Sequence, residues 1–113
     1  MVAFLLSGPG ERQASGAPGL EFAVLGPVRA WRDGEELNLG SPQQRLTLAV
    51  LVLARSRVVQ ASEIISALWA DEEPPSARGT VRTYVHRLRR VLGDDDGPLR
   101  SVGNGYQLRV EEG

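Results

Sequence analysis

Residues 77–93 constrain the fold most strongly, because their apolar and charged side chains separate at the spacing of a helix. Successive helical residues turn by about 100°, so Val81, Val85, Leu88 and Leu92 fall in one narrow sector. The segment also contains five arginines and no acidic residue. We therefore predict a helix that packs on a core by one face and presents arginine on the other.

This basic face belongs to a chain whose net charge is only −1. Residues 76–110 contain seven arginines and three acidic residues, so the positive charge is concentrated in this part of the sequence. A guanidinium group matches both phosphate and guanine edges with two hydrogen bonds. Nucleic acid is therefore the partner that this face favours.

Composition limits the other function classes. A chain of 113 residues suits one domain with a modest core. It has no Cys for a disulfide or a thiolate metal site and a single His. No glycine-rich phosphate loop follows a predicted strand, and no paired carboxylates stand in an apolar frame. We expect no enzyme, no cofactor and no metal. No segment resembles a signal peptide or a membrane span, so we expect no membrane partner and a cytoplasmic, nucleoid-associated location.

The chain divides into three parts. Residues 1–19 are rich in Gly, Pro and Ser and are predicted to be a disordered leader, residues 20–110 the folded domain, and residues 111–113 a C-terminal tail at a truncation point. The domain begins with three short apolar or alternating segments, and Asp33-Gly34 between the last two is a hairpin signal. These segments predict an antiparallel meander with strands at 22–25, 28–32 and 36–39.

The first helix has a strong start. Ser41 can cap it, Pro42 suits its first position, and Gln44 completes a capping box. We predict that it runs to about Ala54. Its apolar residues surround it almost completely, so it is the expected central core helix.

A second helix is predicted over residues 61–69, with its cap left open between Gln60 and Ser62. A proline-containing loop separates it from the arginine-rich helix, which Ser76 is expected to cap and Gly93 to close. A turn at 94–98 leads to two alternating segments, 99–102 and 106–110, around Gly103-Asn104-Gly105. They predict a β-hairpin.

The order of a β-meander, three helices and a C-terminal hairpin predicts an α+β protein with a winged helix-turn-helix. The residues resemble the OmpR-type (OmpR/PhoB-like) winged-helix domain in five places: the meander, the apolar first helix, Leu68-Trp69, the 84–92 helix motif and the Gly103–Tyr106 wing. Within that group they are similar to the antibiotic regulatory protein (SARP) branch, and most of all to the N-terminal domain of AfsR-like regulators. The segments that carry this similarity are Leu25-Gly26-Pro27-Val28, Leu39-Gly40-Ser41-Pro42-Gln43-Gln44-Arg45, Ala67-Leu68-Trp69 and Pro74-Pro75.

The resemblance implies a transcriptional activator of secondary-metabolite (antibiotic) genes. Such proteins bind double-stranded promoter DNA as a tandem dimer on direct repeats and contact RNA polymerase holoenzyme. Matched to the family's recognition helix, Thr83 and Arg87 are expected to contact bases. Other residues of the basic face are expected to contact phosphates; they are Arg78, Arg82, His86, Arg89 and Arg90.

Two further segments carry expectations. The hairpin is the wing, one residue shorter than the OmpR-type pattern and without arginine at its tip, so Arg100 and Asn104 are its candidate contacts. The exposed start of the first helix makes Gln43 a candidate phosphate contact. In the family the loop between the last two helices faces the transcription machinery, which implies polymerase contact by Asp71, Glu72 and Glu73; a solvated loop explains the same residues.

Two alternatives remain open from the sequence. The fold could be a protein-interaction module that binds DNA weakly and without the salt dependence of phosphate contacts. It could also be the output domain of a phosphorelay regulator, although about 19 residues before the fold are too few for a receiver domain.

Overall fold

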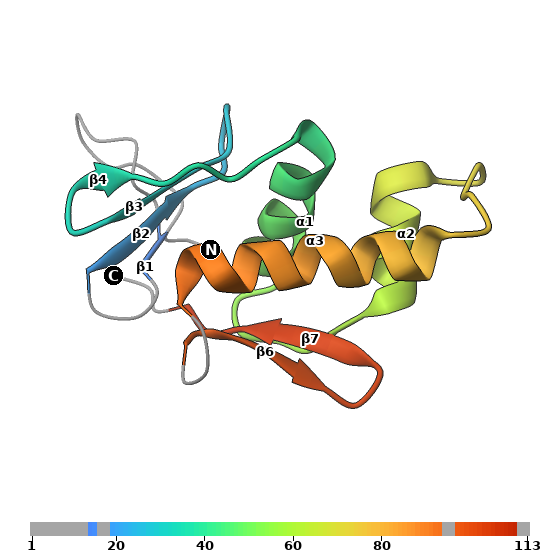
Figure 1. Ribbon diagram of the computed structural model, residues 1–113. Helices are drawn as coiled ribbons and strands as arrows, with labels where there is room; N and C mark the ends of the chain where they lie inside the picture. The colour runs from blue at the N-terminus through green and yellow to red at the C-terminus, as the bar shows by residue number, and fades with distance from the viewer. Residues whose placement is uncertain (1–13, 16–18, 94–96, 111–113) are drawn as a thin grey trace.

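The computed structural model describes residues 14–15, 19–93 and 97–110. An N-terminal antiparallel sheet has the strand order β1-β2-β3-β4 (Figure 1). Its strands are β1 (Ala14–Ser15), β2 (Leu20–Ala23), β3 (Arg29–Arg32) and β4 (Glu35–Glu36). The predicted meander is thus present, with a fourth strand added at its edge.

The sheet differs from the prediction in its details. Two residues of the expected leader, Ala14 and Ser15, pair with β2; the rest of residues 1–18 lies outside the described residues. The strand predicted at 36–39 ends at Glu36, although Leu39 is fully buried. Asp33 and Gly34 both have positive φ, 52° and 89°, as the predicted hairpin turn requires.

Helix α1 (Pro42–Leu53) begins as predicted, with the Gln44 amide donating to the Ser41 hydroxyl at 3.2 Å. The predicted capping box is wrong in one half. The Gln44 side chain is buried and donates to the Leu39 carbonyl at 3.0 Å, so it satisfies the incoming loop. Leu53 stays 51% exposed, which shows that the core covers only part of this apolar helix.

Helix α2 (Ala61–Trp69) follows a two-residue strand, β5 (Val59–Gln60), that the sequence pattern did not predict. The Gln60 backbone amide donates to the Glu63 carboxylate at 3.0 Å. This bond resolves the ambiguous start in favour of Gln60, because it satisfies the backbone amide of the cap residue.

Helix α3 (Ala77–Leu92) has the predicted bounds. Ser76 occupies the cap position, but its side chain accepts no capping hydrogen bond, so that expectation is wrong. At the other end Gly93 has a φ of 125°, and Arg32 of β3 donates to the Leu92 carbonyl. The N-terminal sheet therefore holds the C-terminal end of α3. Of the turn expected at 94–98, residues 94–96 lie outside the described residues.

The wing is the hairpin of β6 (Leu99–Val102) and β7 (Gly105–Leu108). Strand β5 pairs with β7, which gives a three-stranded sheet of order β5-β7-β6. A Cβ at Gly105 would lie 2.4 Å from the Val59 carbonyl oxygen, so only glycine allows this close pairing. The wing is thereby joined to the start of α2.

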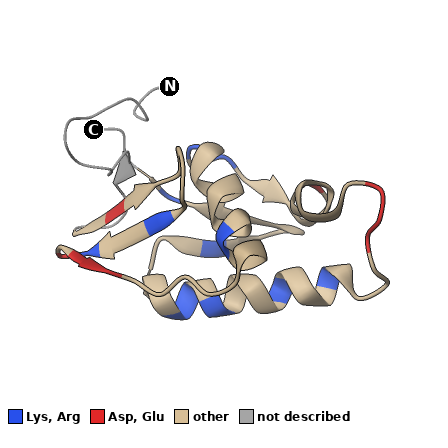
Figure 2. Cartoon of the chain, turned by 90° about the horizontal axis from the view of Figure 1, so that it is seen from above, with Lys and Arg blue, Asp and Glu red and all other residues tan. Residues whose placement is uncertain are grey.

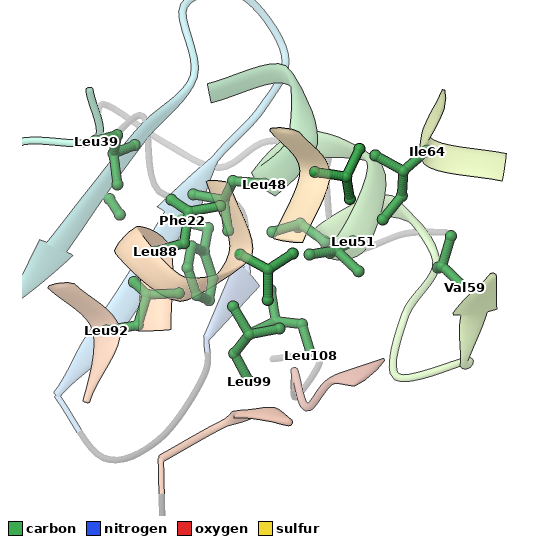
Figure 3. Close-up of a cluster of buried hydrophobic side chains, with 14 of the residues drawn as sticks. Phe22, Leu39, Leu48, Leu51, Val59, Ile64, Leu88, Leu92, Leu99 and Leu108 are labelled. Carbon is green, nitrogen blue, oxygen red and sulfur yellow. The ribbon is translucent and has the colours of Figure 1, made fainter. Parts of the chain in front are cut away.

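One hydrophobic core connects all these elements (Figure 3). Phe22 of the N-terminal sheet, Leu48 of α1, Ile64 of α2, Leu88 of α3 and Leu108 of the wing are all fully buried in it. Burying a leucine side chain contributes about 1.5–3 kcal/mol. Because both sheets and all three helices supply such residues, the core fixes the position of α3 relative to the wing. The three helices and the wing form the predicted winged helix-turn-helix.

Candidate nucleic-acid interface

The buried stripe of α3 orients its basic face. Val81, Val85, Leu88 and Leu92 are at most 1% exposed, as the helical spacing predicts. The opposite side is exposed and rich in arginine, and Figure 2 shows basic residues spaced along the helix. Its exposed members are Arg78, Arg82, Thr83, His86, Arg87 and Arg90.

The face divides into two flanks when the helix is viewed along its axis. At about 100° per residue, Arg78, Arg82 and Arg89 fall within roughly 40° of one another. We call these three residues the wing flank, because they lie on the side of α3 that contacts β6 and β7. The second set is turned away from the wing, and we call it the open flank; it consists of Thr83, Arg87 and Arg90.

On the open flank, the side chains of Arg87 and Arg90 form no hydrogen bond or ion pair with the described part of the chain. Thr83 is partly engaged, since its hydroxyl donates to the Gly79 carbonyl one turn earlier at 3.1 Å. This bond orients the threonine side chain on the helix surface. Two guanidinium groups and a threonine methyl are therefore available to a ligand on this flank.

Arg89 behaves differently from the other arginines. It is half-buried, and its Nε donates to the Leu99 carbonyl at 3.2 Å while Nη2 donates to the Ser101 hydroxyl at 3.1 Å. Both acceptors belong to β6. Arg89 is a predicted phosphate contact, and in the structure its guanidinium is directed to the wing.

A groove separates the N-terminal half of α3 from the wing tip. One part has a volume of about 220 Å³ and is lined by Ala61, Arg78, Arg82, Ser101, Gly103, Asn104, Gly105 and Tyr106. An adjoining part of about 330 Å³ is lined by Gln60, Ala61, Ser62, Arg78 and Asn104. Among the described residues, no acidic side chain lines either part, and both parts contain guanidinium, hydroxyl and amide groups that can donate hydrogen bonds. Such a lining suits an anionic ligand.

The candidate wing residues lie on different sides of the hairpin. Asn104 lines the groove, and its carbonyl accepts from the Ala61 amide at 3.3 Å, which ties the wing tip to α2. Arg100 precedes Ser101 on β6, and neighbouring strand residues point to opposite faces. Because Ser101 faces Arg89, Arg100 points away from the groove.

Gln43, the candidate at the start of α1, is held by a residue of α3. The Tyr84 hydroxyl donates to Gln43 Oε1 at 2.8 Å. This contact orients the amide and leaves its NH₂ group free to donate. The Tyr84 residue that makes this contact is itself half-buried.

The acidic segment Asp71-Glu72-Glu73 is exposed between α2 and α3. Figure 2 shows it beyond the N-terminal end of α3, away from the C-terminal arginines of that helix. The Glu72 amide donates to the Trp69 carbonyl at 2.9 Å, so the loop begins with a tight turn. The structure thus keeps these carboxylates off the basic face.

Sequence reasoning missed part of this interface. Gln60, Ser62 and Tyr106 line the groove, although none was a candidate. Their position depends on the pairing of β5 with β7, which joins residues far apart in the chain. Within the described residues, no helix is long and apolar enough to cross a bilayer, and no three His, Cys, Asp or Glu side chains gather as a metal site.

Comparison with known proteins identifies similar domains. Residues 34–108 match the family model described as "Transcriptional regulatory protein, C terminal". The regulatory protein AfsR of Streptomyces coelicolor is 55% identical over 101 residues, which cover 89% of this chain and 10% of AfsR. The structure of Mycobacterium tuberculosis EmbR superposes with a TM-score of 0.76 at 36% identity, covering 82% of this chain and 26% of EmbR.

A more distant structure shares the fold. The response regulator DrrB of Thermotoga maritima, an OmpR/PhoB homologue, superposes with a TM-score of 0.69 at 20% identity, over 85% of this chain and 44% of DrrB. The chain spans about a tenth of the length of AfsR and a quarter of the length of EmbR.

Proposed function

Since the chain belongs to the SARP branch of the OmpR-type transcriptional regulators, we propose that it binds specific double-stranded DNA at promoters and activates transcription of antibiotic biosynthesis genes. Its family implies DNA binding in transcription regulation. The observation that carries the specific proposal is the exposed face of α3, which presents arginine without any acidic residue above a buried apolar stripe. A solvated helix face usually mixes both signs of charge.

The open flank of α3 reads sequence in the major groove. Arg87 donates two hydrogen bonds to a guanine edge, and the Thr83 methyl packs against a thymine methyl. Both side chains are exposed, and Arg87 has no partner in the described part of the chain that it would have to give up.

The other contacts bind the DNA backbone and position the helix without reading sequence. The arginines of the groove, Arg78 and Arg82, bind phosphates together with Asn104 of the wing tip. On the other side of the helix, Gln43 donates to a phosphate through the amide that Tyr84 orients. Arg90 and His86 add contacts at the middle of the face. Arg100 points away from the groove and contributes to DNA binding only through its long-range electrostatic attraction.

Activation requires a contact with the transcription machinery. We assign it to the exposed residues Asp71, Glu72 and Glu73, whose loop lies beyond the N-terminal end of α3 (Figure 2). Because carboxylates repel phosphate, this loop suits a basic surface of RNA polymerase holoenzyme better than DNA. On direct repeats two copies bind in tandem with the same orientation, so one such loop lies free at an end of the pair. A regulator of this kind acts in the cytoplasm on the nucleoid.

The most informative test is to sequence genomic fragments retained by the protein at two salt concentrations and to footprint the strongest. We expect a recurring direct repeat, protection of both half-sites, and binding that weakens steeply with salt because condensed counterions are released. The alternative, a protein-interaction module, predicts weak retention with no recurrent sequence and little salt dependence. That result would exclude specific DNA binding.

A further inference from the structure

Besides the pairing of β7 with β5, two groups of hydrogen bonds hold the wing beside the groove. At its tip, the Asn104 carbonyl accepts from the Ala61 amide at the start of α2. At its base, Arg89 of α3 donates to two groups of β6, the Leu99 carbonyl and the Ser101 hydroxyl. The groove lies between these two ties, so together with the β5–β7 pairing they set how far the hairpin stands from α3.

The base tie suits an arginine better than a lysine. The two acceptors belong to residues two positions apart on β6, and they receive hydrogen bonds from different nitrogens of one guanidinium. The planar fork of arginine presents these donors in a fixed geometry, whereas a lysine ammonium is a single point charge. Arg89 therefore differs in its contacts from Arg82, which lies two helical turns earlier on the same flank and lines the groove.

We propose that Arg89 is a positioning residue: it holds the wing at a fixed distance from α3, so that the groove between them admits one strand of the DNA backbone. The proposal rests on the DNA binding proposed above. It assigns the groove's phosphate contacts to Arg78 and Arg82 and gives Arg89 a role in shaping the groove. The wing tip, which has no arginine, then relies on its fixed position to contact DNA.

Three variants separate positioning from direct phosphate contact. Arg89→Lys keeps the positive charge and removes the fork. Ser101→Ala removes one acceptor and changes no charge. Arg109→Lys is the matched control, since Arg109 is exposed outside the groove and follows β7. Thermal unfolding of each variant shows whether the domain remains folded.

Hydrogen exchange of the free protein is the first readout. A hydrogen bond to a charged group contributes about 1.5–3 kcal/mol, which corresponds to roughly a tenfold change or more. We therefore expect wing amides at 102–106 to exchange about tenfold faster in both Arg89→Lys and Ser101→Ala, with α1 and Arg109→Lys unchanged. Unchanged wing exchange in both variants would overturn the proposal, whether or not DNA binds.

DNA binding to the footprinted site is the second readout. Positioning predicts that Arg89→Lys and Ser101→Ala each weaken binding about tenfold, lose wing protection in hydroxyl-radical footprints and keep the wild-type salt dependence. A direct phosphate contact by Arg89 predicts a different result. The lysine of Arg89→Lys then replaces the arginine at the phosphate with little loss of affinity, and Ser101→Ala binds DNA like the wild type. That outcome would overturn the proposal. If the wild type itself binds no specific site, the proposed function fails, and the exchange data alone decide the role of Arg89.

Discussion

The two flanks of α3 carry the same residue type in different surroundings. On the wing flank, Arg89 is half-buried and bonded to β6, and Arg78 and Arg82 line a groove. On the open flank, Arg87 and Arg90 are exposed and have no partner among the described residues. The difference arises from the helix rotation, because a second element packs beside one flank only.

This contrast separates affinity from specificity. A groove that encloses part of a ligand favours a uniform feature such as the phosphate backbone, whereas an open helix face can enter the major groove and meet base edges. Arginines on one helix can therefore have three roles here: base contact, phosphate contact and positioning of the wing.

The largest effect is expected where both flanks depend on one residue. Leu88 lies on the buried face of α3 and is fully buried. Leu→Ala changes in protein cores cost about 2–5 kcal/mol. Leu88→Ala should lower the free energy of unfolding by about this amount in urea titrations and reduce binding to every DNA. If the free energy of unfolding of Leu88→Ala equals the wild-type value, the burial of Leu88 does not support the two flanks.

The next effect distinguishes the flanks by specificity. Arg87→Ala should reduce the discrimination between the cognate site and a scrambled duplex by about 1–3 kcal/mol, because one bidentate base contact is lost. Titration of both duplexes by fluorescence anisotropy measures it. Arg90→Ala is the matched comparison and should weaken both duplexes alike. Equal losses in the two variants would mean that the open flank contacts backbone only.

A smaller effect identifies the phosphate contacts of the wing flank. Arg82→Ala should weaken cognate and scrambled duplexes equally and should make the slope of log K against log salt shallower by about 0.9, the value for one phosphate. Binding measured at several salt concentrations gives the slope. An unchanged slope, with lost discrimination, would place Arg82 on a base.

The smallest effect concerns the support of the wing through α2. The hydrogen bond from the Gln60 backbone amide, assisted by Arg57, lowers the pKa of Glu63 below 4.5. A lowered folded-state pKa stabilises the protein above the unfolded-state pKa, and this contribution is lost as pH falls through the folded value. Thermal unfolding should thus favour the wild type over Glu63→Gln near neutral pH, and the difference should shrink on acidification as pH falls through the lowered folded-state pKa of Glu63. A difference that grows on acidification would contradict this assignment.

The elements set by local chemistry could be predicted from the sequence. The apolar spacing of α3, the Ser41 cap and the Asp33-Gly34 turn are properties of neighbouring residues, and the structure confirms them. The second helix likewise has its predicted bounds, 61–69.

Contacts between distant elements could not be predicted in the same way. Arg89 bonds to the wing, and Gln44 bonds to the Leu39 carbonyl, because other segments place acceptors beside them. Strand β5 exists only because β7 pairs with it. Helical spacing placed Arg89 on the basic face but could not identify its partners on the wing, which only the packing of distant segments reveals.

Directed cleavage of DNA from the helix tests most directly whether the open flank enters the major groove. The chain has no Cys, so Thr83→Cys can carry a single iron chelate that cleaves nearby DNA. On the footprinted site, we predict strong cleavage centred on a half-site, with the strand offset that is typical of the major groove. A minor-groove offset, or no cleavage by a labelled protein that still binds the site, would contradict the assignment of α3 as the recognition helix.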